Sequence, residues 1–575
     1  MEDLSAQEEG CSSLSSDFIS GTKNDDTPRF DPASPDEGQI DLVILHFNDV
    51  YEVESRKEEP AGGAARFATA IKKFSFLNPL IIFSGDCLNP SALSVITKGK
   101  HMIPILNALG VHFAVFGNHE FDFGLDLLEE YRKQIQFPWF LSNVQDKVTS
   151  EPLGHGIIKT IVTWNGVQIG FMGLVEEDWL DTLATINKSN LNYVDYVKVA
   201  NELSVELKAK GAEVIIAMTH MKWVNDIRLA QSTEGIDLVL GGHDHDYGIK
   251  QVNGTWIVKS GSDFRNFTRI NIKKVGEAFH YTFRKIDVLQ HLEEDTHIQS
   301  IIQDSAQNLQ TLLKEVLCPI DVELDGRVTT VRRVESNLGN LVTNAMLEAT
   351  HADLALLNSG TLRSNRIHPI GNFTMHDLLS ILPFMDALLV VRITGERLLE
   401  ALENGVCRYP ALDGRFPQVA GIEFGFDPNA EPGHRILRDS VKIQGQYLRR
   451  KHIYRLAVKE YLANGKDGYV MFQDCPRMFG TETAQMLFTV VMNHFESIKI
   501  VRGTKQCCSG HRMSLVTKSK STSLIAFETR TDEQEAIIAV PGIEGRICHI
   551  SQDMKEHLQQ IRMERQEGFL DLLLI

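Results

Sequence analysis

The sequence lacks the features that place a chain in a membrane or send it across one. It has no apolar run long enough to span a bilayer, and the apolar end at 569–575 is also too short for a lipid-anchor signal. The first forty residues are rich in Ser, Asp and Glu, and they do not combine a cationic start with an apolar segment. This is not the pattern of a secretory signal. We therefore expect no membrane partner.

Closely spaced cysteines are also scarce. The eight cysteines are scattered along the chain, and Cys507-Cys508 is the only cluster among them. A disulfide framework in a secreted protein would show more regular, closer spacing, so this pattern indicates reduced thiols. Together with the missing secretory signal, it predicts a cytoplasmic protein.

Positive charge is in deficit. The chain has 58 Lys and Arg against 76 Asp and Glu, which gives a formal net charge of −18. A nucleic-acid polymer requires a basic surface, so the charge argues against such a partner. A small anionic substrate held in one local basic pocket remains compatible with it. The sequence identifies no protein partner.

The length of 575 residues exceeds one ordinary domain, and the 43% hydrophobic content is enough for sizeable cores. Apolar residues recur at helical spacing from Thr296 to Leu317, with Cys318-Pro319 at the end, which predicts a connecting helix. A helix packed against either domain would give the same pattern. The predicted segments are a disordered acidic terminus at 1–39, a first domain at 40–292, a helical linker at 293–318, a second domain at 319–504 and a C-terminal extension at 505–575.

Strand and helix patterns alternate through the first domain, which predicts an α/β layered fold. Helical patterns lie at 61–74 and 193–208, and another begins near Gly124. The apolar segments expected to form buried strands are 42–47, 80–83, 112–116, 214–218 and 236–240. Further strands are expected at 138–141, 159–164, 168–172, 257–260, 267–273 and 280–288.

Each of the five buried strands stops at a residue type that binds metal ions. These residues are Asp49, Asp86, Asn118, His220 and the pair His243 and His245. In open α/β folds the ligand crevice lies beyond the carboxyl ends of the strands, so these side chains are expected to converge. Any one of them alone is more simply a loop residue or a satisfied histidine. Agreement among five strand ends predicts a metal centre.

The types of ligand narrow the choice of metal. Carboxylate, amide oxygen and imidazole together suit a borderline divalent ion such as Zn, Mn, Fe or Co. Six ligands are too many for one tetrahedral ion, whereas two ions bridged by a carboxylate would use them all. Asp86 is the candidate bridge. We therefore expect two divalent ions, with Zn, Mn or Co the leading candidates.

The stretch Gly117-Asn118-His119-Glu120-Phe121-Asp122 adds acid–base chemistry to this centre. His119 supplies an imidazole that can stabilise developing charge or protonate a leaving group, and the Asp122 carboxylate can orient it. A His119 that only supports a neighbouring ligand is the alternative role.

Five blocks of this chain together resemble the calcineurin-like metallophosphoesterases. The blocks are Asn48-Asp49, Gly85-Asp86, Gly117-Asn118-His119-Glu120, Thr219-His220 and Gly242-His243-Asp244-His245. The longer Gly-Asn-His-Glu-Phe-Asp form resembles the 5′-nucleotidase branch. The resemblance implies a four-layer metallophosphoesterase sandwich at 40–292, with His119 and Asp122 in catalytic positions and Asp49, Asp86, Asn118, His220, His243 and His245 as metal ligands.

One position departs from that family. Its first block is usually Asp-x-His, with the His binding the first metal, and here Tyr51 stands at that position. A phenol is a poor ligand unless deprotonated, and its unperturbed pKa is about 10. Three arrangements remain open: a weakly held first metal, a metal bound through water, and support by Tyr51 as phenolate. His46, further back on the strand, is expected to be packed rather than ligating.

The second domain resembles the C-terminal, nucleotide-binding domain of the same family, so the fold class is two α/β domains joined by a helix. The blocks that carry the resemblance are 335–340, 358–363, 382–384 and 465–469. Arg363 offers a forked grip on phosphate, and Phe384 and Tyr461 can sandwich a flat base. The resemblance implies substrate-binding roles for Arg332, Asn358, Arg363, Phe384, Tyr461 and Asp467.

The second domain also departs from the family pattern. Thr361-Leu362 replaces a Gly-Ile pair, Lys466 replaces a glycine, and Asp386 stands where asparagine is common. Base preference is therefore open. After residue 504 the resemblance fades, and the helical pattern at 553–566 fits a packed cap or a partner-binding helix equally well.

The pattern predicts a two-metal enzyme that hydrolyses nucleoside 5′-monophosphates or related nucleotides, with a hydroxide between the ions as nucleophile. Because the metal ligands and the nucleotide residues lie in different domains, we expect domain closure or rotation. Two alternatives stay open. One is a nucleotide-binding module with weak or no turnover, motivated by Tyr51 and the altered glycines. The other is a phosphoesterase for cyclic nucleotides or nucleotide sugars.

Overall fold

The computed structural model describes residues 41–550, except 184, 479, 481–482, 502, 508 and 522–540. The predicted disorder at 1–39 and the predicted helix at 553–566 lie outside these residues. Within the described part, every helix is too short or too polar to cross a bilayer. The six cysteines that the structure describes are all free thiols.

The N-terminal half is built on two six-stranded sheets. The first sheet has the order β14-β13-β1-β2-β3-β4, and β1 to β4 run parallel while β13 pairs antiparallel with β1. Its strands are β1 Leu42–Phe47, β2 Leu80–Phe83, β3 Phe113–Val115, β4 Trp139–Phe140, β13 Asn266–Val275 and β14 Ala278–Asp287.

The second sheet has the order β11-β12-β10-β9-β7-β6, with four parallel central strands and an antiparallel strand at each edge. Its strands are β6 Lys159–Trp164, β7 Val167–Val175, β9 Val214–Met221, β10 Leu238–His243, β11 Tyr247–Val252 and β12 Thr255–Ser260. Parallel central strands buried on both faces explain why these segments read as continuous apolar runs.

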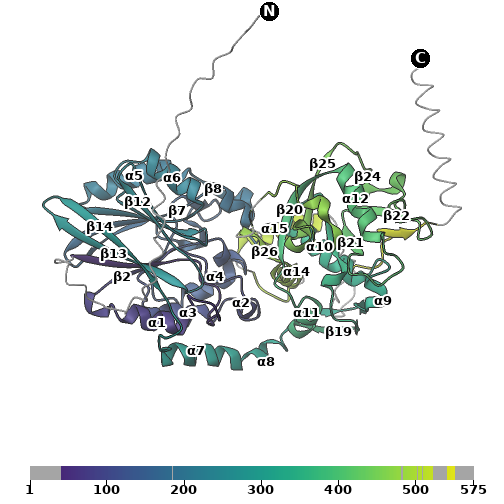
Figure 1. The fold of residues 1–575 in the computed structure, drawn as a ribbon, viewed down its shortest axis with the longest axis horizontal. Helices are drawn as coiled ribbons and strands as arrows, with labels where there is room; N and C mark the ends of the chain where they lie inside the picture. Colours follow the sequence, from purple (N-terminus) through teal and green to yellow (C-terminus); the bar gives the residue numbers. More distant parts are fainter. Residues whose placement is uncertain are drawn as a thin grey trace, which may run out of the picture. The chain divides into compact units, whose positions relative to one another are not determined.

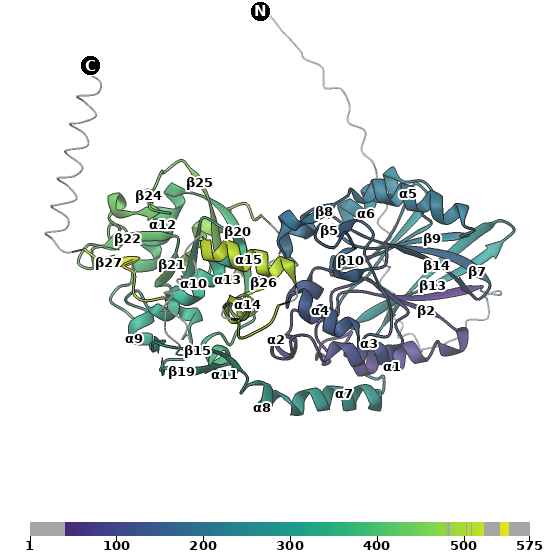
Figure 2. The same ribbon diagram turned by 180° about the vertical axis from the view of Figure 1, so that it is seen from behind.

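Alternating side chains assign each strand face to a layer. Ile44 of β1 packs with Ile216 of β9 in the core between the two sheets. Ile215, one residue earlier on β9, faces the opposite way and packs against α5 (Tyr196–Ala209) and α6 (Trp223–Ser232). Helices α1 (Ala64–Lys72) and α3 (Met102–Leu109) cover the far side of the first sheet, as Figures 1 and 2 show. The half is therefore the predicted four-layer sandwich.

Two of the ligand-bearing strands are longer than the sequence predicts. β9 extends through His220 to Met221, and β10 extends through Gly242 to His243, so both histidines lie within strands rather than after them. The backbone register pairs Gly242 of β10 with His220 of β9. The expected breaks at Thr219 and Gly241 were wrong because parallel neighbours on both sides continue the hydrogen bonding.

The predicted linker helix is shorter than its apolar pattern. The structure has α7 at Thr296–Gln307 and α8 at Leu309–Leu312, and then a strand, β15, at Val316–Ile320. The prediction of a helix to Leu317 ended by Cys318-Pro319 was therefore wrong. Leu317 and Cys318 are buried in the core of the C-terminal half, and β15 pairs with β19 (Gly371–Thr374). The apolar residues keep a helical spacing up to Leu317, but tertiary packing determines that this segment forms a strand.

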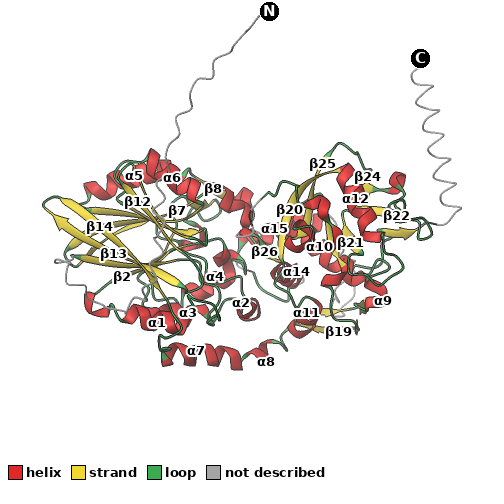
Figure 3. Ribbon diagram, viewed as in Figure 1, coloured by secondary structure: helices red, strands yellow, loops and turns green. Residues whose placement is uncertain are grey.

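The C-terminal half has a five-stranded mixed sheet of order β21-β17-β25-β20-β26. Its strands are β17 Leu354–Asn358, β20 Ala387–Thr394, β21 Pro417–Ala420, β25 Ile453–Lys459 and β26 Gln485–Met486. On one face Ala355 and Leu357 pack with α10 (Asn337–Thr350) and α14 (Leu487–Val501). On the other face Leu354 and Leu356 pack with α12 (Gly395–Val406). Figure 3 shows these helices and strands, and the half is α/β as predicted.

Part of the predicted C-terminal extension belongs to this half. Strand β27, Ile547–His549, pairs in parallel with β22, Ile422–Phe426. Arg546 donates hydrogen bonds to the carbonyl of Val419 and to the side-chain amide oxygen of Asn344. Residues 544–550 thus add an edge to the C-terminal fold.

Candidate metal centre and nucleotide site

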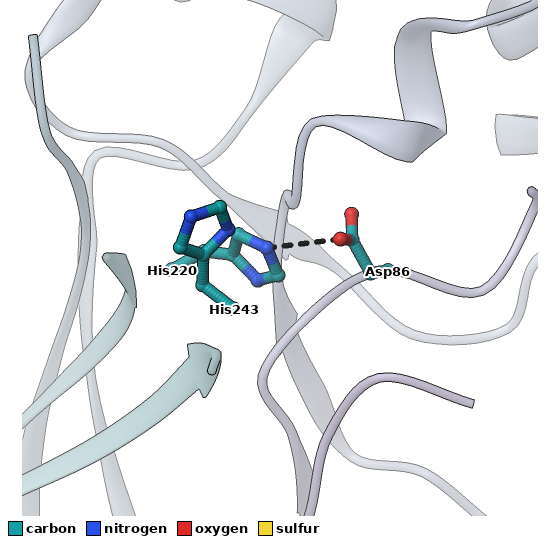
Figure 4. A group of neighbouring side chains, drawn as sticks. All are labelled: Asp86, His220 and His243. Atoms are coloured by element: carbon teal, nitrogen blue, oxygen red, sulfur yellow. Dashed lines mark ion pairs between the residues drawn. The ribbon is translucent and has the colours of Figure 1, made fainter. Parts of the chain in front are cut away.

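Three predicted ligands from three strands meet in the N-terminal half. Asp86 follows β2, His220 lies in β9 and His243 ends β10, and one ligand atom of each lies within 4.8 Å of the others. Figure 4 shows the two imidazoles beside the carboxylate, with His220 Nε2 3.1 Å from Asp86 Oδ2. All three side chains are buried. In the described part of the chain, no other group of three His, Cys, Asp or Glu side chains brings its ligand atoms this close together.

Two buried polar atoms in and beside this group have no hydrogen-bond partner. They are His243 Nδ1 and the Oδ1 of Asn118, the residue before His119, whereas His220 Nε2 is paired with Asp86. Leaving a buried donor or acceptor unpaired costs about 1–3 kcal/mol, so two together need a physical explanation. Each atom is of a type that binds a divalent metal, and a bound ion would satisfy both of them. The residues therefore fit a metal ion.

The electrostatics of the group also suit a cation. Burial would lower the pKa of His220, but the carboxylates of Asp86 and Asp49 outweigh burial and raise it to about 9. Without a metal, the positive charge that these carboxylates favour is therefore supplied by a protonated His220. Burial and the neighbouring His220 lower the pKa of His243, which keeps its imidazole neutral and able to bind a metal.

His119 and Asp122 form the predicted pair beside the metal group. His119 Nδ1 lies 2.8 Å from Asp122 Oδ2, and both side chains are buried. Asn89 donates a second hydrogen bond to the same Asp122 oxygen, at 2.6 Å. The backbone N–H of His119 donates to Asp86 Oδ1 at 2.9 Å. The imidazole is therefore oriented by Asp122 and tied to the metal group through Asp86.

The remaining predicted ligands, Asp49 and His245, lie beside Tyr51. The Tyr51 hydroxyl is 3.0 Å from Asp49 Oδ1 and 3.0 Å from His245 Nε2. It is also 3.2 Å from Asp86 Oδ2, so the phenol reaches the edge of the first group. As predicted, His46 is packed rather than ligating, since its two ring nitrogens contact Ser260 and Ser84.

Glu120 and Lys259 hold this site together, and neither was assigned a role from the sequence. The Glu120 carboxylate accepts hydrogen bonds from the backbone N–H groups of Gly117, Asp86 and Cys87. It thereby joins the loops after β2 and β3. Lys259 is fully buried, and its Nζ donates to the carbonyls of Met221 and Gly242. The sequence signal for the role of Lys259 was its position as a single lysine within the apolar strand 255–260.

In the C-terminal half, five predicted substrate residues form two sets of contacts. The Asp467 carboxylate accepts from the Asn358 amide at 2.7 Å and from the Tyr461 hydroxyl at 2.9 Å. The Arg363 guanidinium lies over the Phe384 ring, 5.6 Å from its centroid, and donates to the carbonyl of Gly360. The Phe384 side chain is 50% exposed and Tyr461 is 40% exposed, so both rings are available to a flat ligand.

Arg332 lies apart from these contacts, and Lys459 joins them. Arg332 donates to the carbonyl of Leu412 at 2.9 Å and makes no contact with the other five predicted residues among the interactions seen in the described part of the chain. Lys459 Nζ bonds Thr361 and the Asp386 carboxylate, 2.9 and 2.7 Å away, and lies 4.9 Å from the centre of the Tyr461 ring. Asp386 stood out in the sequence as a departure from the family, whereas its buried partner Lys459 did not.

The two-sheet sandwich and its buried carboxylate–imidazole group define a metallophosphoesterase. A family model for calcineurin-like phosphoesterases matches residues 42–247, and a model for the 5′-nucleotidase C-terminal domain matches residues 316–474. The chain therefore belongs to the 5′-nucleotidase family, with both of its domains.

Known proteins agree with this assignment. The trifunctional nucleotide phosphoesterase protein YfkN of Bacillus subtilis is 28% identical over 496 residues, which is 77% of this chain but only 33% of that protein. The mouse 5′-nucleotidase is 26% identical over 533 residues, 82% of this chain and 90% of the mouse protein. The solved structure of a Haemophilus influenzae NAD nucleotidase has a TM-score of 0.66 at 18% identity, over 89% of this chain and 99% of that one. At that identity, the structural likeness concerns the fold alone.

Proposed function

We propose that this protein is a metal-dependent hydrolase that releases phosphate from nucleoside 5′-monophosphates or related nucleotides. The observation that carries the proposal is the buried group of Asp86, His220 and His243, with unpaired ligand atoms on His243 and on Asn118. The mouse and Bacillus relatives, named 5′-nucleotidase and nucleotide phosphoesterase, support the choice of substrate class.

Asp86, Asn118, His220 and His243 would hold the divalent ion. When bound, the ion supplies a Lewis acid that neutralises charge on the phosphoryl group and makes a water nucleophilic near neutral pH. His119, fixed by Asp122, is placed beside the ligands to stabilise the negative charge that develops on phosphorus oxygens. The same imidazole can donate a proton to the leaving nucleoside oxygen.

The C-terminal residues would bind the rest of the nucleotide. The exposed rings of Phe384 and Tyr461 offer stacking surfaces for a base, and each stacking contact contributes about 1–3 kcal/mol in comparable sites. Arg363 carries a planar guanidinium suited to phosphate or ribose oxygens, and Asn358 with Asp467 offers amide and carboxylate groups. The proposed reaction requires that this half present the phosphate to the metal group, and domain closure or rotation, as expected from the sequence, is part of the proposal.

The proposal also includes the identity of the metal ion, the location of the protein in the cell and the pathway in which it acts. The mixed imidazole and oxygen ligands favour Zn, Mn or Co. The six free thiols of the described residues support a reducing compartment, and therefore a cytosolic role in nucleotide catabolism. Cell fractionation with a cytosolic marker tests the location, and recovery of the protein in the secreted fraction would refute it.

A substrate panel tests the proposed activity. Purified protein is assayed with AMP, UMP, a cyclic nucleotide, a nucleotide sugar and an aryl phosphate, each under Mn²⁺, Co²⁺ and Zn²⁺. We expect metal-dependent phosphate release from AMP or UMP, faster than from the aryl phosphate. Release from aryl phosphate alone would remove the nucleotide assignment. Absence of release from every substrate, with nucleotide binding retained, would favour a binding module.

A further inference from the structure

The metal ligands of this chain divide into two groups that differ in one physical respect. In the first group, which also contains the paired Asp86 and His220, the ligand atoms of Asn118 and His243 are buried and have no hydrogen-bond partner. In the second group, the ligand atoms of Asp49 and His245 are already engaged by protein hydrogen bonds. The first group is therefore prepared for an ion, and the second is satisfied without one.

The Tyr51 hydroxyl accounts for this difference. Its oxygen lies 3.0 Å from Asp49 Oδ1, 3.0 Å from His245 Nε2 and 3.2 Å from Asp86 Oδ2. These three atoms are the ones that a second ion, bridged to the first through Asp86, would need. The phenol oxygen therefore occupies the space that such an ion would require.

The other oxygen of Asp49 is also occupied. Asp49 Oδ2 accepts from the Asn48 side-chain amide at 2.6 Å and from the backbone N–H of His243 at 2.9 Å. Both carboxylate oxygens of Asp49 thus have protein donors. An ion binding here would have to displace the Tyr51 hydroxyl from Asp49 Oδ1, and would gain no previously unsatisfied atom in return.

Tyr51 is not free to move aside. Its side chain is only 5% exposed, and its ring packs edge-on against His119 with centroids 5.9 Å apart. On another side the ring of His245 lies 5.3 Å away. Moving the phenol would break its contacts with Asp49, Asp86 and His245 and disturb the neighbouring His119 imidazole, so close packing adds to the cost of a second ion.

We propose that this chain holds one divalent ion tightly, at Asp86, Asn118, His220 and His243, and that the Tyr51 hydroxyl fills the position of a second ion. Tyr51 in this role fixes Asp49 and His245 by hydrogen bonds instead of by coordination. The inference rests on the metal dependence of the proposed function but not on which phosphoester is cleaved.

Metal stoichiometry, measured without substrate, tests the proposal. Chelator-stripped protein is titrated with Mn²⁺ alone by calorimetry, and bound Mn²⁺ is examined by electron paramagnetic resonance. We expect one tight ion per wild-type chain, with the six-line spectrum of an isolated ion. Tyr51→His should bind two ions and show the signal loss of an exchange-coupled pair, with the second ion held at least about tenfold more tightly than in the wild type.

Tyr51→Phe separates a blocking hydroxyl from a coordinating one. If the hydroxyl blocks the position, its removal leaves second-site affinity equal to or higher than that of the wild type. If the oxygen were a ligand, its removal would lower that affinity. Asp86→Asn is the matched control that should lose the tight ion, and circular dichroism checks that each variant is folded.

Two tight ions with exchange coupling in the wild type would overturn the proposal, as would loss of an ion in Tyr51→Phe. Because no substrate enters the experiment, a negative result in the nucleotide assay leaves this test intact. A wild-type chain that binds no Mn²⁺ at all would refute the metal assignment as well.

Discussion

Replacing Lys259 tests how the two histidine-bearing strands are held. Lys259 Nζ donates to the carbonyls of Met221 and Gly242, which adjoin His220 and His243. It also contacts two carboxylates, Asp244 and the fully buried Asp226, 3.1 Å from the latter. We predict that Lys259→Met destabilises the N-terminal half and weakens metal binding, since one change removes the bonds on both strands.

The size of the effect follows from the buried pair. Removing one partner of a buried ion pair costs about 3–5 kcal/mol, because the other charge stays buried without compensation. Burial already raises the pKa of Asp226 to about 6 against the opposing effect of Lys259. Without the lysine the pKa of Asp226 rises further. At pH values below that pKa the carboxyl group is protonated, so no unpaired charge is left buried. The penalty should therefore be larger at pH 8 than at pH 5.5.

Urea denaturation followed by tryptophan fluorescence measures this penalty. All five tryptophans lie in the N-terminal half, at 139, 164, 179, 223 and 256, so the signal reports that half. Asp226→Asn combined with Lys259→Met should recover most of the lost stability, since it removes the unpaired charge and keeps an acceptor for Thr219. A penalty below about 1 kcal/mol, or one that does not change with pH, would refute the reasoning.

Three further predictions concern catalysis, substrate binding and pH. His119→Ala should lower kcat for AMP by about 10²–10⁴-fold with metal binding retained, and an equal rate would remove His119 from the mechanism. Phe384→Ala should raise KM for AMP by a factor corresponding to about 1–3 kcal/mol and leave KM for an aryl phosphate nearly unchanged; equal shifts for both substrates would argue against base stacking. Burial and Lys259 lower the pKa of His46 to about 3, so the unfolded chain binds a proton that the folded chain excludes, and stability should fall by about 1.4 kcal/mol per pH unit as pH drops from 6.5 towards 4. Urea titrations of the wild type and His46→Gln across this range check the last prediction, which fails if the slopes are the same.

The arrangement of the fold and the meeting of distant ligands were predictable from local pattern. Parallel strands place their carboxyl ends at one edge of a sheet, so the residues after each apolar run define a common crevice. Asp86, His220 and His243 are brought together in this way, although 157 positions separate the first from the last (243 − 86). The pairing of His119 with Asp122 was also accessible, because the two lie on one turn of a short helix.

Other features depend on contacts that no local pattern encodes. The apolar spacing up to Leu317 fits a helix, whereas pairing with β19 and burial in the C-terminal core make 316–320 a strand. The sequence left three roles open for Tyr51, since the reach of its hydroxyl depends on where Asp49, Asp86 and His245 lie in space. The tie between β9 and β10 through Lys259 likewise needs the three strands to be assembled first.

The most direct test of the central claim compares metal-dependent phosphate release from AMP in two proteins. Wild type and Asp86→Asn are stripped with a chelator, Mn²⁺ is added back in steps, and the initial rate is followed at each step. We expect the wild type to recover its activity as Mn²⁺ binds and Asp86→Asn to remain inactive. A rate that is indifferent to chelation, or is equally restored in both proteins, would contradict it.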